Sequence, residues 1–285
     1  MNREKIAILT DTGSDIGLKY ANEHDINLIP LHVNFSDRSY REVVELTSEE
    51  LYEKLELEIP KTSIASIEEI KDEFKKIREK GIKKVIAIAI SSNLSGFCNA
   101  MRLAAKEMED MDIFVYDTKN ISIATGFYSI YARELIDQGL SFEEIKEKMN
   151  EKITASSVFF TVKSLKHLIK GGRIGRVKGS LGEFLSIKPI ISCDPEGVYY
   201  NYDVARGDKN SLKKLIKAAQ DKISECNNYY LAIGEGNNEK GLAYCKEIMK
   251  KEIEGAKIYY EMKIAPSLGT HTGPGLMGIG VFNAD

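Results

Sequence analysis

Residues 85–96 read Val-Ile-Ala-Ile-Ala-Ile-Ser-Ser-Asn-Leu-Ser-Gly, an unbroken apolar run that ends in a turn rich in hydroxyl groups. Such a run is typical of a strand that is buried on both faces, as in a parallel sheet. Comparable runs at residues 6–10 and 113–116 are also followed by turn or helix-start residues, and long helical patterns separate the three runs. This alternation predicts a parallel sheet with helices on both faces.

Three helix starts in the first half of the chain carry the pattern S/T-x-x-E. The pairs are Thr47/Glu50, Ser66/Glu69 and Ser141/Glu144. In this pattern the hydroxyl and the carboxylate each accept a hydrogen bond from a backbone amide that the first helical turn leaves unpaired. These starts support repeated β-α units in the first half.

The pattern changes in the second half, where the predicted strands are shorter. We expect these strands at residues 158–161, 188–192, 198–202, 229–234 and 257–264, with helices near 211–224 and 239–250. The segment Cys193-Asp194-Pro195-Glu196-Gly197 joins two of the strands and suits a hairpin turn, because Pro and Gly favour turn positions. The sequence therefore predicts an α/β lobe at residues 1–158 and an α+β lobe at residues 159–285, packed closely together.

Composition excludes several classes of protein. The chain has 285 residues and a formal net charge of −3, which argues against a general nucleic-acid surface. The four cysteines have no CxxC pair and the four histidines are dispersed, so we expect free thiols and no metal site. Residues 6–9 are too short a run for a signal peptide, and no run reaches the length of an integral membrane segment. We therefore expect a cytoplasmic protein.

Four catalytic or nucleotide-binding motifs are absent or misplaced. Residues 273–278 fit G-x-G-x-x-G, but no βαβ unit follows them in this sequence. Asp11-Thr12-Gly13 spells the aspartic-protease triplet without a second copy, which leaves only a protease formed by two chains. There is no G-x-S-x-G elbow and no G-x-x-x-x-G-K-[ST] phosphate loop.

Hydroxyl-rich turns after the predicted strands are the main candidates for a binding site, since ligands of open parallel sheets sit there. They lie at residues 11–15, 61–63, 91–96 and 117–120. A helical pattern begins near Ser95, so its unpaired amides would suit a carboxylate or a phosphate. The alternative is that these hydroxyls only cap helices and turns.

Two further segments carry candidate residues. Residues 269–275 place His271 among glycines and threonines in a predicted loop that a ligand can approach closely, although a lone His is often structural. Residues 163–178 hold six Lys and Arg around Gly171-Gly172. This basic cluster suits an anion or an acidic partner surface, or it is a solvated face.

Taken together and in this order, these segments resemble the DegV family over nearly the whole chain. The residues that carry the resemblance are Thr10 to Asp15, Lys61-Thr62-Ser63, Ile90 to Gly96, Asp117-Thr118, Lys170 to Ile174, Ile187 to Ile190 and Gly269 to Gly275. The resemblance implies a two-lobed fold with a long-chain fatty acid lying between an N-terminal α/β lobe and a C-terminal α+β lobe. It also implies a separate fatty acid kinase as partner, which phosphorylates the bound carboxylate, and no cofactor in this chain.

The resemblance further implies which residues contact the ligand and the partner. The carboxylate would meet Thr62, the Ser91/Ser92 turn, Ser95 and the loop with Thr270 and His271, with Ser92 favoured over Ser91. Arg173 and Arg176 would lie near the edge of the site that faces the kinase. Ile64-Ala65 stand where the family commonly has Gln-Pro, and Phe97 stands where it commonly has Thr. Both differences make the expected site more apolar.

Two other functions stay open from the residues alone. One is an independent enzyme that acts on a small hydroxylated or phosphorylated substrate, using His271 with Ser92 or Asp11. The other is a regulatory module that senses lipid. Acyl phosphate that forms only when the chain and a kinase are both present would favour a carrier over a sensor.

Overall fold

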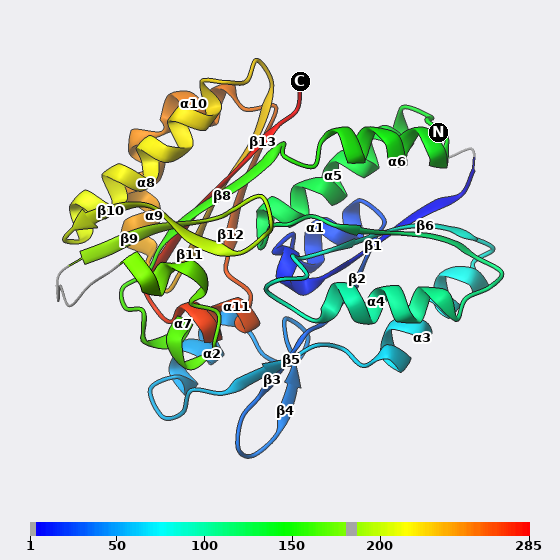
Figure 1. The fold of residues 1–285 in the computed structure, drawn as a ribbon, viewed down its shortest axis with the longest axis horizontal. Helices are drawn as coiled ribbons and strands as arrows, with labels where there is room; N and C mark the ends of the chain where they lie inside the picture. The colour runs from blue at the N-terminus through cyan, green and yellow to red at the C-terminus, as the bar shows by residue number, and fades with distance from the viewer. Residues whose placement is uncertain (1–3, 181–186) are drawn as a thin grey trace.

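The computed structural model describes residues 4–180 and 187–285, and within them the strands form three sheets. Figure 1 shows two large sheets side by side, with the first half of the chain on the right and most of the second half on the left. A small third sheet projects below them. The two-lobed α/β architecture predicted from the sequence is confirmed.

The first sheet is fully parallel, with strand order β2-β1-β6-β7. Its strands are β1 (Ile6–Asp11), β2 (Ile26–Ile29), β6 (Lys84–Ala89) and β7 (Asp112–Asp117). All six residues of β1 are buried. That burial on both faces explains why the apolar residues of the central strands do not alternate with polar ones.

Helices cover both faces of the parallel sheet, as Figure 1 shows. They are α1 (Leu18–Glu23), α3 (Ile67–Glu79), α4 (Phe97–Lys106), α5 (Ile123–Asp137) and α6 (Phe142–Glu151). The three predicted capping boxes are confirmed at the starts of α3, α6 and α2 (Ser48–Lys54). Helix α5 packs on β1 and β6 and also on two strands of the second sheet, so it lies between the two sheets.

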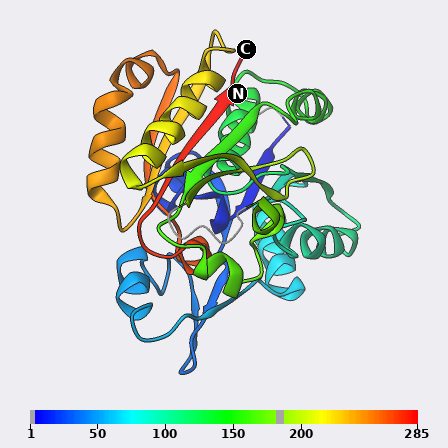
Figure 2. The same cartoon turned by 60° about the vertical axis from the view of Figure 1, so that its left-hand side comes forward.

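The second sheet has strand order β10-β9-β8-β13-β11-β12 and is antiparallel except for the pair β11 and β12. Its strands are β8 (Ser156–Thr161), β9 (Ile187–Cys193), β10 (Tyr199–Arg206), β11 (Tyr229–Gly236), β12 (Ile258–Lys263) and β13 (Leu276–Asn283). The helices α8 (Asp208–Ile223), α9 (Glu239–Ile248) and α10 (Lys250–Gly255) lie on its outer side in Figure 2, in yellow and orange. The predicted α+β lobe is confirmed, whereas the division at residues 158/159 falls inside β8 and stays a prediction.

Strand β13 was not predicted from the sequence, because residues 273–278 were considered only as a match to a nucleotide-binding motif. Gly280 lies in this strand, where a Cβ atom would stand 2.6 Å from Ile123 Cγ2 of α5. The glycine therefore allows α5 to pack closely against the second sheet.

The small third sheet was also missed. It is antiparallel, with strand order β4-β3-β5, and its strands are β3 (His32–Asn34), β4 (Ser39–Arg41) and β5 (Lys61–Ser63). The prediction of a turn at residues 61–63 is wrong, because this segment is strand β5 and pairs with β3. Three residues are too few to show the alternation that identifies a strand in a sequence.

Short helices complete the fold. They are the 3₁₀ helices η1 (Thr12–Ser14) and η2 (Gly175–Ser180) and the α-helices α7 (Lys166–Lys170) and α11 (Pro266–Thr272). Helix α11 corrects the prediction of a loop for residues 269–272, whereas residues 273–275 form a turn before β13. The helix packs on α2, α7, β3 and β5. Within residues 4–180 and 187–285, no helix has the length and apolar character needed to cross a membrane.

The predicted hairpin of β9 and β10 is confirmed, and its turn joins the two lobes. Asp194 Oδ1 accepts hydrogen bonds from the amides of Glu196 and Val198. The Ser91 hydroxyl donates to the carbonyl of Gly197 over 2.8 Å, and the Asn93 side chain donates to the carbonyl of Glu196 over 2.7 Å. The turn after β6 therefore holds the hairpin of the other lobe.

The variant Ser91→Ala tests this contact between the lobes. The Ser91 side chain is fully buried, so its removal leaves a carbonyl without its partner and lowers the free energy of unfolding by about 1–3 kcal/mol. Urea denaturation measures the change. The control is Ser224→Ala, at an exposed hydroxyl that donates to the Asp221 carbonyl, which we expect to change stability by less than about 0.5 kcal/mol. Equal changes in the two variants would contradict the account.

Candidate functional site

A cavity lies where the two large sheets and the small sheet meet, and residues from both lobes line it. The space between its atoms amounts to about 580 Å³, part of which is open to solvent. We call it the polar cavity because hydroxyls, an imidazole and a guanidinium line one end. These side chains belong to Thr62, Ser63, Ser95, Arg173, Ser267, His271 and Thr272.

The pair Thr62 and His271 closes one wall of the polar cavity. Thr62 Oγ1 of β5 and His271 Nε2 of α11 form a hydrogen bond of 2.8 Å. The other ring nitrogen, Nδ1, is buried and has no hydrogen-bond partner among residues 4–180 and 187–285. Burial lowers the pKa of His271 to about 4, and the positive charge of Arg173 adds to the effect. His271 is therefore a neutral imidazole at pH 7.

The space beside His271 depends on Gly171. A Cβ atom at this position would stand 2.1 Å from His271 Nδ1. Gly171 has an ordinary helical φ, so it is the close approach of the imidazole that requires a glycine here.

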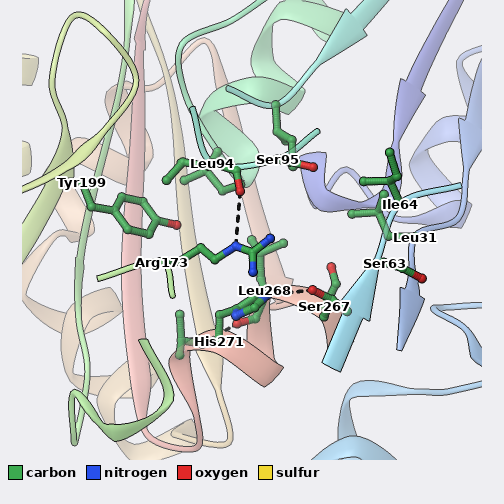
Figure 3. Close-up of a pocket in the computed structure, with 14 residues that line it drawn as sticks. Leu31, Ser63, Ile64, Leu94, Ser95, Arg173, Tyr199, Ser267, Leu268 and His271 are labelled. Carbon is green, nitrogen blue, oxygen red and sulfur yellow. Dashed lines mark hydrogen bonds between the residues drawn. The ribbon is translucent and has the colours of Figure 1, made fainter. Parts of the chain in front are cut away.

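Arg173 reaches into the polar cavity from the segment after α7. Figure 3 shows its side chain between Leu94 and His271. Its Nη1 donates to the Gly171 carbonyl over 2.7 Å, and its Nε lies 3.4 Å from the Leu94 carbonyl oxygen. Among the residues that the structure describes, no carboxylate forms an ion pair with Arg173. Its positive charge is thus available to an anion in the cavity.

A second cavity, here called the apolar cavity, continues from the first. It encloses about 370 Å³ between the start of α5 and the second sheet. Most of its lining is aliphatic or aromatic, including Ile123, Val158, Phe160 and Met262. The two cavities share four lining residues, which are Ile121, Tyr199, Leu268 and Thr272. Together they suit a ligand with one polar or anionic end and a long apolar body.

The polar cavity brings together three of the predicted contact residues and leaves three outside. Thr62, Ser95 and His271 line it. The Ser95 hydroxyl accepts a hydrogen bond from the Phe97 amide, which leaves the hydroxyl hydrogen available as a donor. Ser63, Ser267 and Thr272 also line the cavity, and the sequence analysis did not single out their side chains as ligand contacts.

The other three predicted contact residues have hydrogen bonds within the protein. Ser91 donates to the hairpin, and Thr270 donates to the Pro266 carbonyl over 2.9 Å. The Ser92 amide donates to Asp117, and its hydroxyl lies 3.5 Å from Lys119 Nζ. The geometry thus favours Ser95 over Ser92 as the serine that faces a ligand.

The comparisons with known proteins agree with this geometry. A family model described as "Uncharacterised protein, DegV family" matches residues 5–284. The chain belongs to the DegV family. A DegV domain-containing protein of Clostridium acetobutylicum is 40% identical over 97% of this chain and 98% of its own length. A fatty acid-binding protein of Thermotoga maritima is 30% identical over 97% of each chain.

A solved structure supports the same assignment. It is described as fatty acid binding of a DegV family protein from Thermus thermophilus. It matches with a TM-score of 0.91 at 26% identity, over 98% of this chain and 99% of the other. The fold of this DegV-family chain is thus that of proteins described as binding fatty acids.

Arg173 and Arg176 were predicted to lie near the edge of the site that faces the kinase. Their surroundings in the structure differ. Arg173 lines the polar cavity, whereas Arg176 is exposed and forms ion pairs of 2.5 Å with Asp194 and Glu196 of the hairpin turn. The Lys178 side chain of the same basic segment lies outside the described residues. A role for Arg176 in docking stays a prediction.

Two buried carboxylates of the N-terminal lobe hold the start of α11 in this DegV-family chain. Glu42 accepts hydrogen bonds from the Ser267 amide over 2.5 Å and from the Ser267 hydroxyl over 3.0 Å. Asp15 accepts one from the Ala265 amide over 2.8 Å. We call Asp15 and Glu42 the α11 clamp. It fixes the helix that carries His271.

Burial raises the pKa of Asp15 and of Glu42 to about 7. Hydrogen bonds from Ser122 to Asp15 and from Thr12 to Glu42 act in the opposite direction. Asp11 is also fully buried, and its pKa is raised to about 7 by burial and by the nearby charge of Glu42. It accepts a hydrogen bond from the Gly13 amide and does not line the polar cavity. These carboxylates are structural.

No group of three or more His, Cys, Asp or Glu residues within residues 4–180 and 187–285 is arranged to hold a metal ion. All four cysteines are free thiols, as predicted.

The raised pKa values predict a pH-dependent stability. A carboxyl group whose pKa is higher in the folded state than in the unfolded state stabilises the fold fully at low pH, and this contribution is lost as the pH rises through the folded pKa. We therefore expect the free energy of unfolding to fall between about pH 4 and pH 7, that is, between the pKa values of these groups in the unfolded and folded states. The variant Glu42→Gln removes one such group. It makes the decrease of the unfolding free energy with pH less steep, by at most about 1.4 kcal/mol per pH unit.

Urea denaturation at a series of pH values measures the slope. The control is Glu247→Gln at an exposed position on α9, which we expect to leave the slope as it is in the wild type. A Glu42→Gln variant with the wild-type slope would show that Glu42 does not titrate in this range.

Proposed function

We propose that this chain binds one long-chain fatty acid between its two lobes, with the carboxylate in the polar cavity and the acyl chain in the apolar cavity. The observation that carries the proposal is the pair of connected cavities, polar at one end and apolar at the other. The described fatty acid binding of the relatives in Thermotoga maritima and Thermus thermophilus supports it.

The carboxylate contacts follow from the lining of the polar cavity. We assign Ser95 and the hydrogen-bonded pair of Thr62 and His271 as donors, and Arg173 as the positive charge nearest to the carboxylate. Because neutral His271 and Thr62 share one hydrogen in their mutual bond, the pair offers the carboxylate one donor, from either Thr62 Oγ1 or His271 Nδ1. An arginine and a neutral imidazole suit one negative charge, because hydrogen bonds to a charged group are stronger than those between neutral groups. A bound carboxylate would also raise the pKa of His271, which is low in part because only positive groups act on it.

Most of the affinity comes from the acyl chain. A saturated chain of about sixteen carbons buries about fourteen methylenes, worth on the order of 11 kcal/mol before the costs of association are subtracted. Ile64, which stands where the family commonly has Gln, lines the polar cavity and adds an apolar side chain to it. Phe97 is fully buried in the core and does not line either cavity.

We further propose that the chain acts in the cytoplasm and presents the carboxylate to a separate ATP-dependent fatty acid kinase, without catalysis of its own. The absence of a recognised phosphate loop from the sequence supports delivery of ATP by a partner. Acyl phosphate that forms only when the loaded chain and such a kinase are both present tests this step. The same product with the kinase and free fatty acid alone would contradict it.

An independent enzyme is the second candidate, and one observation disfavours it. The proposed pairs joined His271 to Ser92 or to Asp11, and neither of these residues lines the polar cavity with His271. A general base must lie within hydrogen-bond reach of the group it serves.

Organic extraction of the purified protein followed by mass spectrometry tests the fatty acid proposal. We expect one fatty acid per chain in the native mass of the wild type. In the variants Thr62→Ala and His271→Ala we expect about 10- to 100-fold weaker binding, since each loses a hydrogen bond to a charged group. The control Thr154→Ala, at an exposed position, binds as the wild type does. An empty wild-type protein that also fails to bind added fatty acid would overturn the proposal.

A further inference from the structure

A polar groove lies on the outer, helix-covered face of the second sheet, which Figure 2 shows beneath the yellow and orange helices. The space between its atoms amounts to about 950 Å³, part of which is open to solvent. Its lining comes from the end of β8, the first turns of α8 and α9, and the turn before β13. We call it the helix-start groove.

The second sheet separates this groove from the apolar cavity. Successive side chains of a strand point to opposite faces of its sheet. Phe160 of β8 lines the apolar cavity, whereas the next residue, Thr161, lines the helix-start groove. The groove is therefore a separate feature from the site proposed for a fatty acid.

Two helices begin at the helix-start groove. Asp208 and Ser211 of α8 line it, and so do Asn238 and Lys240 at the start of α9. The amides of a first helical turn have no partner within their own helix, and the positive end of the helix dipole lies there. Gly207 at the start of α8 provides no side-chain cap for these amides. Two such helix ends at one groove favour an anion.

Thr161 adds a buried hydroxyl at the base of the groove. The residue is 4% exposed, and its Oγ1 has no hydrogen-bond partner within residues 4–180 and 187–285. A buried hydroxyl without a partner costs free energy. Thr161 lies on the helix side of the sheet, as do Phe159 of the same strand and Met277, its neighbour on β13. Its hydroxyl is therefore placed to donate to a ligand between the two helix starts.

The charge of the helix-start groove is positive. Lys163 and Lys240 line it, and neither ammonium group forms an ion pair in the parts of the chain that the structure describes. Asp208 also lines it, but its carboxylate is paired with Lys188 over 2.9 Å. The aliphatic part of Lys163 lies across Gly275, where a Cβ atom would stand 3.1 Å from Lys163 Cβ. This packing keeps the Lys163 side chain beside the groove.

We propose that the helix-start groove binds a small phosphate monoester, with the phosphate between the starts of α8 and α9. Lys163 and Lys240 supply positive charge, and Thr161 and the first amides of α8 supply hydrogen bonds. A phosphate monoester suits this set, since it carries about two negative charges at pH 7 and three strong acceptor oxygens.

The lining also limits which phosphate ester fits. None of the described residues that line the groove is aromatic, so it offers no surface on which a nucleotide base would stack. Polar side chains such as Ser211 and Asn237 suit a small hydroxylated group attached to the phosphate. Because the sheet lies between the two sites, such a ligand binds whether or not a fatty acid is present.

Isothermal titration calorimetry of the full chain with sn-glycerol 3-phosphate tests the proposal, with glycerol as the matched probe that lacks the phosphate. We expect saturable binding of one glycerol 3-phosphate per chain and no binding of glycerol. The variant Lys163→Gln/Lys240→Gln should weaken binding by about 5- to 10-fold, as two partly screened ionic contacts are lost. The control Lys80→Gln/Lys106→Gln removes the same charge at the ends of α3 and α4 in the first lobe and leaves the affinity unchanged.

The variant Thr161→Val separates a ligand contact from a structural role. It keeps the shape of the side chain and removes the hydroxyl, so we expect about 10-fold weaker binding, the loss of one hydrogen bond to a charged group. The urea midpoint should stay the same or rise, because the hydroxyl has no partner in the described chain. The control Thr154→Val, at an exposed position, binds as the wild type does.

Three results would overturn the proposal. They are a wild type without saturable binding of glycerol 3-phosphate, equal weakening in the Lys80→Gln/Lys106→Gln control, and wild-type affinity in Thr161→Val. Each can be read whether or not the chain binds hexadecanoate, so failure of the fatty acid proposal is a distinct result.

Discussion

The hydrogen bonds between the α11 clamp and the start of α11 are the contact on which the binding site depends. Helix α11 has seven residues, and an isolated helix of that length is not stable in water. Glu42 and Asp15 of the first lobe fix its first amides, which belong to Ser267 and Ala265. Because His271 follows on the same helix, its distance to Thr62 is set by a contact between lobes. The site therefore exists only when the lobes are docked.

Two polar side chains at the polar cavity, Arg173 and His271, are left without an anionic partner among residues 4–180 and 187–285. In the part of the chain that the structure describes, Arg173 has only carbonyl partners, and His271 keeps an unpartnered ring nitrogen in a buried position. Unpaired polar groups of this kind cost free energy in a protein interior. A carboxylate in the polar cavity would pair with Arg173, and the apolar cavity beyond would hold the chain attached to it.

The sequence predicted the features that depend on local signals. The capping boxes, three of the four parallel strands (β1, β6 and β7) and the β9–β10 hairpin each have a pattern of a few adjacent residues, whereas β2 was not predicted. Three-residue strands such as β5 carry no such pattern, and β13 was missed because it is glycine-rich, with Gly280 placed where α5 packs closely. The choice of Ser95 over Ser92 depends on where α4 begins. The inward position of Arg173 depends on how the lobes meet, which no local pattern encodes.

A crystal structure of the protein with hexadecanoate tests the central claim most directly, which is that the two cavities hold one acyl chain in a single direction. The account predicts carboxylate oxygens within hydrogen-bond distance of Thr62 and His271, with the acyl chain beyond Leu268 among the residues of the apolar cavity. A carboxylate at the far end of the apolar cavity, or a ligand bound outside both cavities, would contradict it.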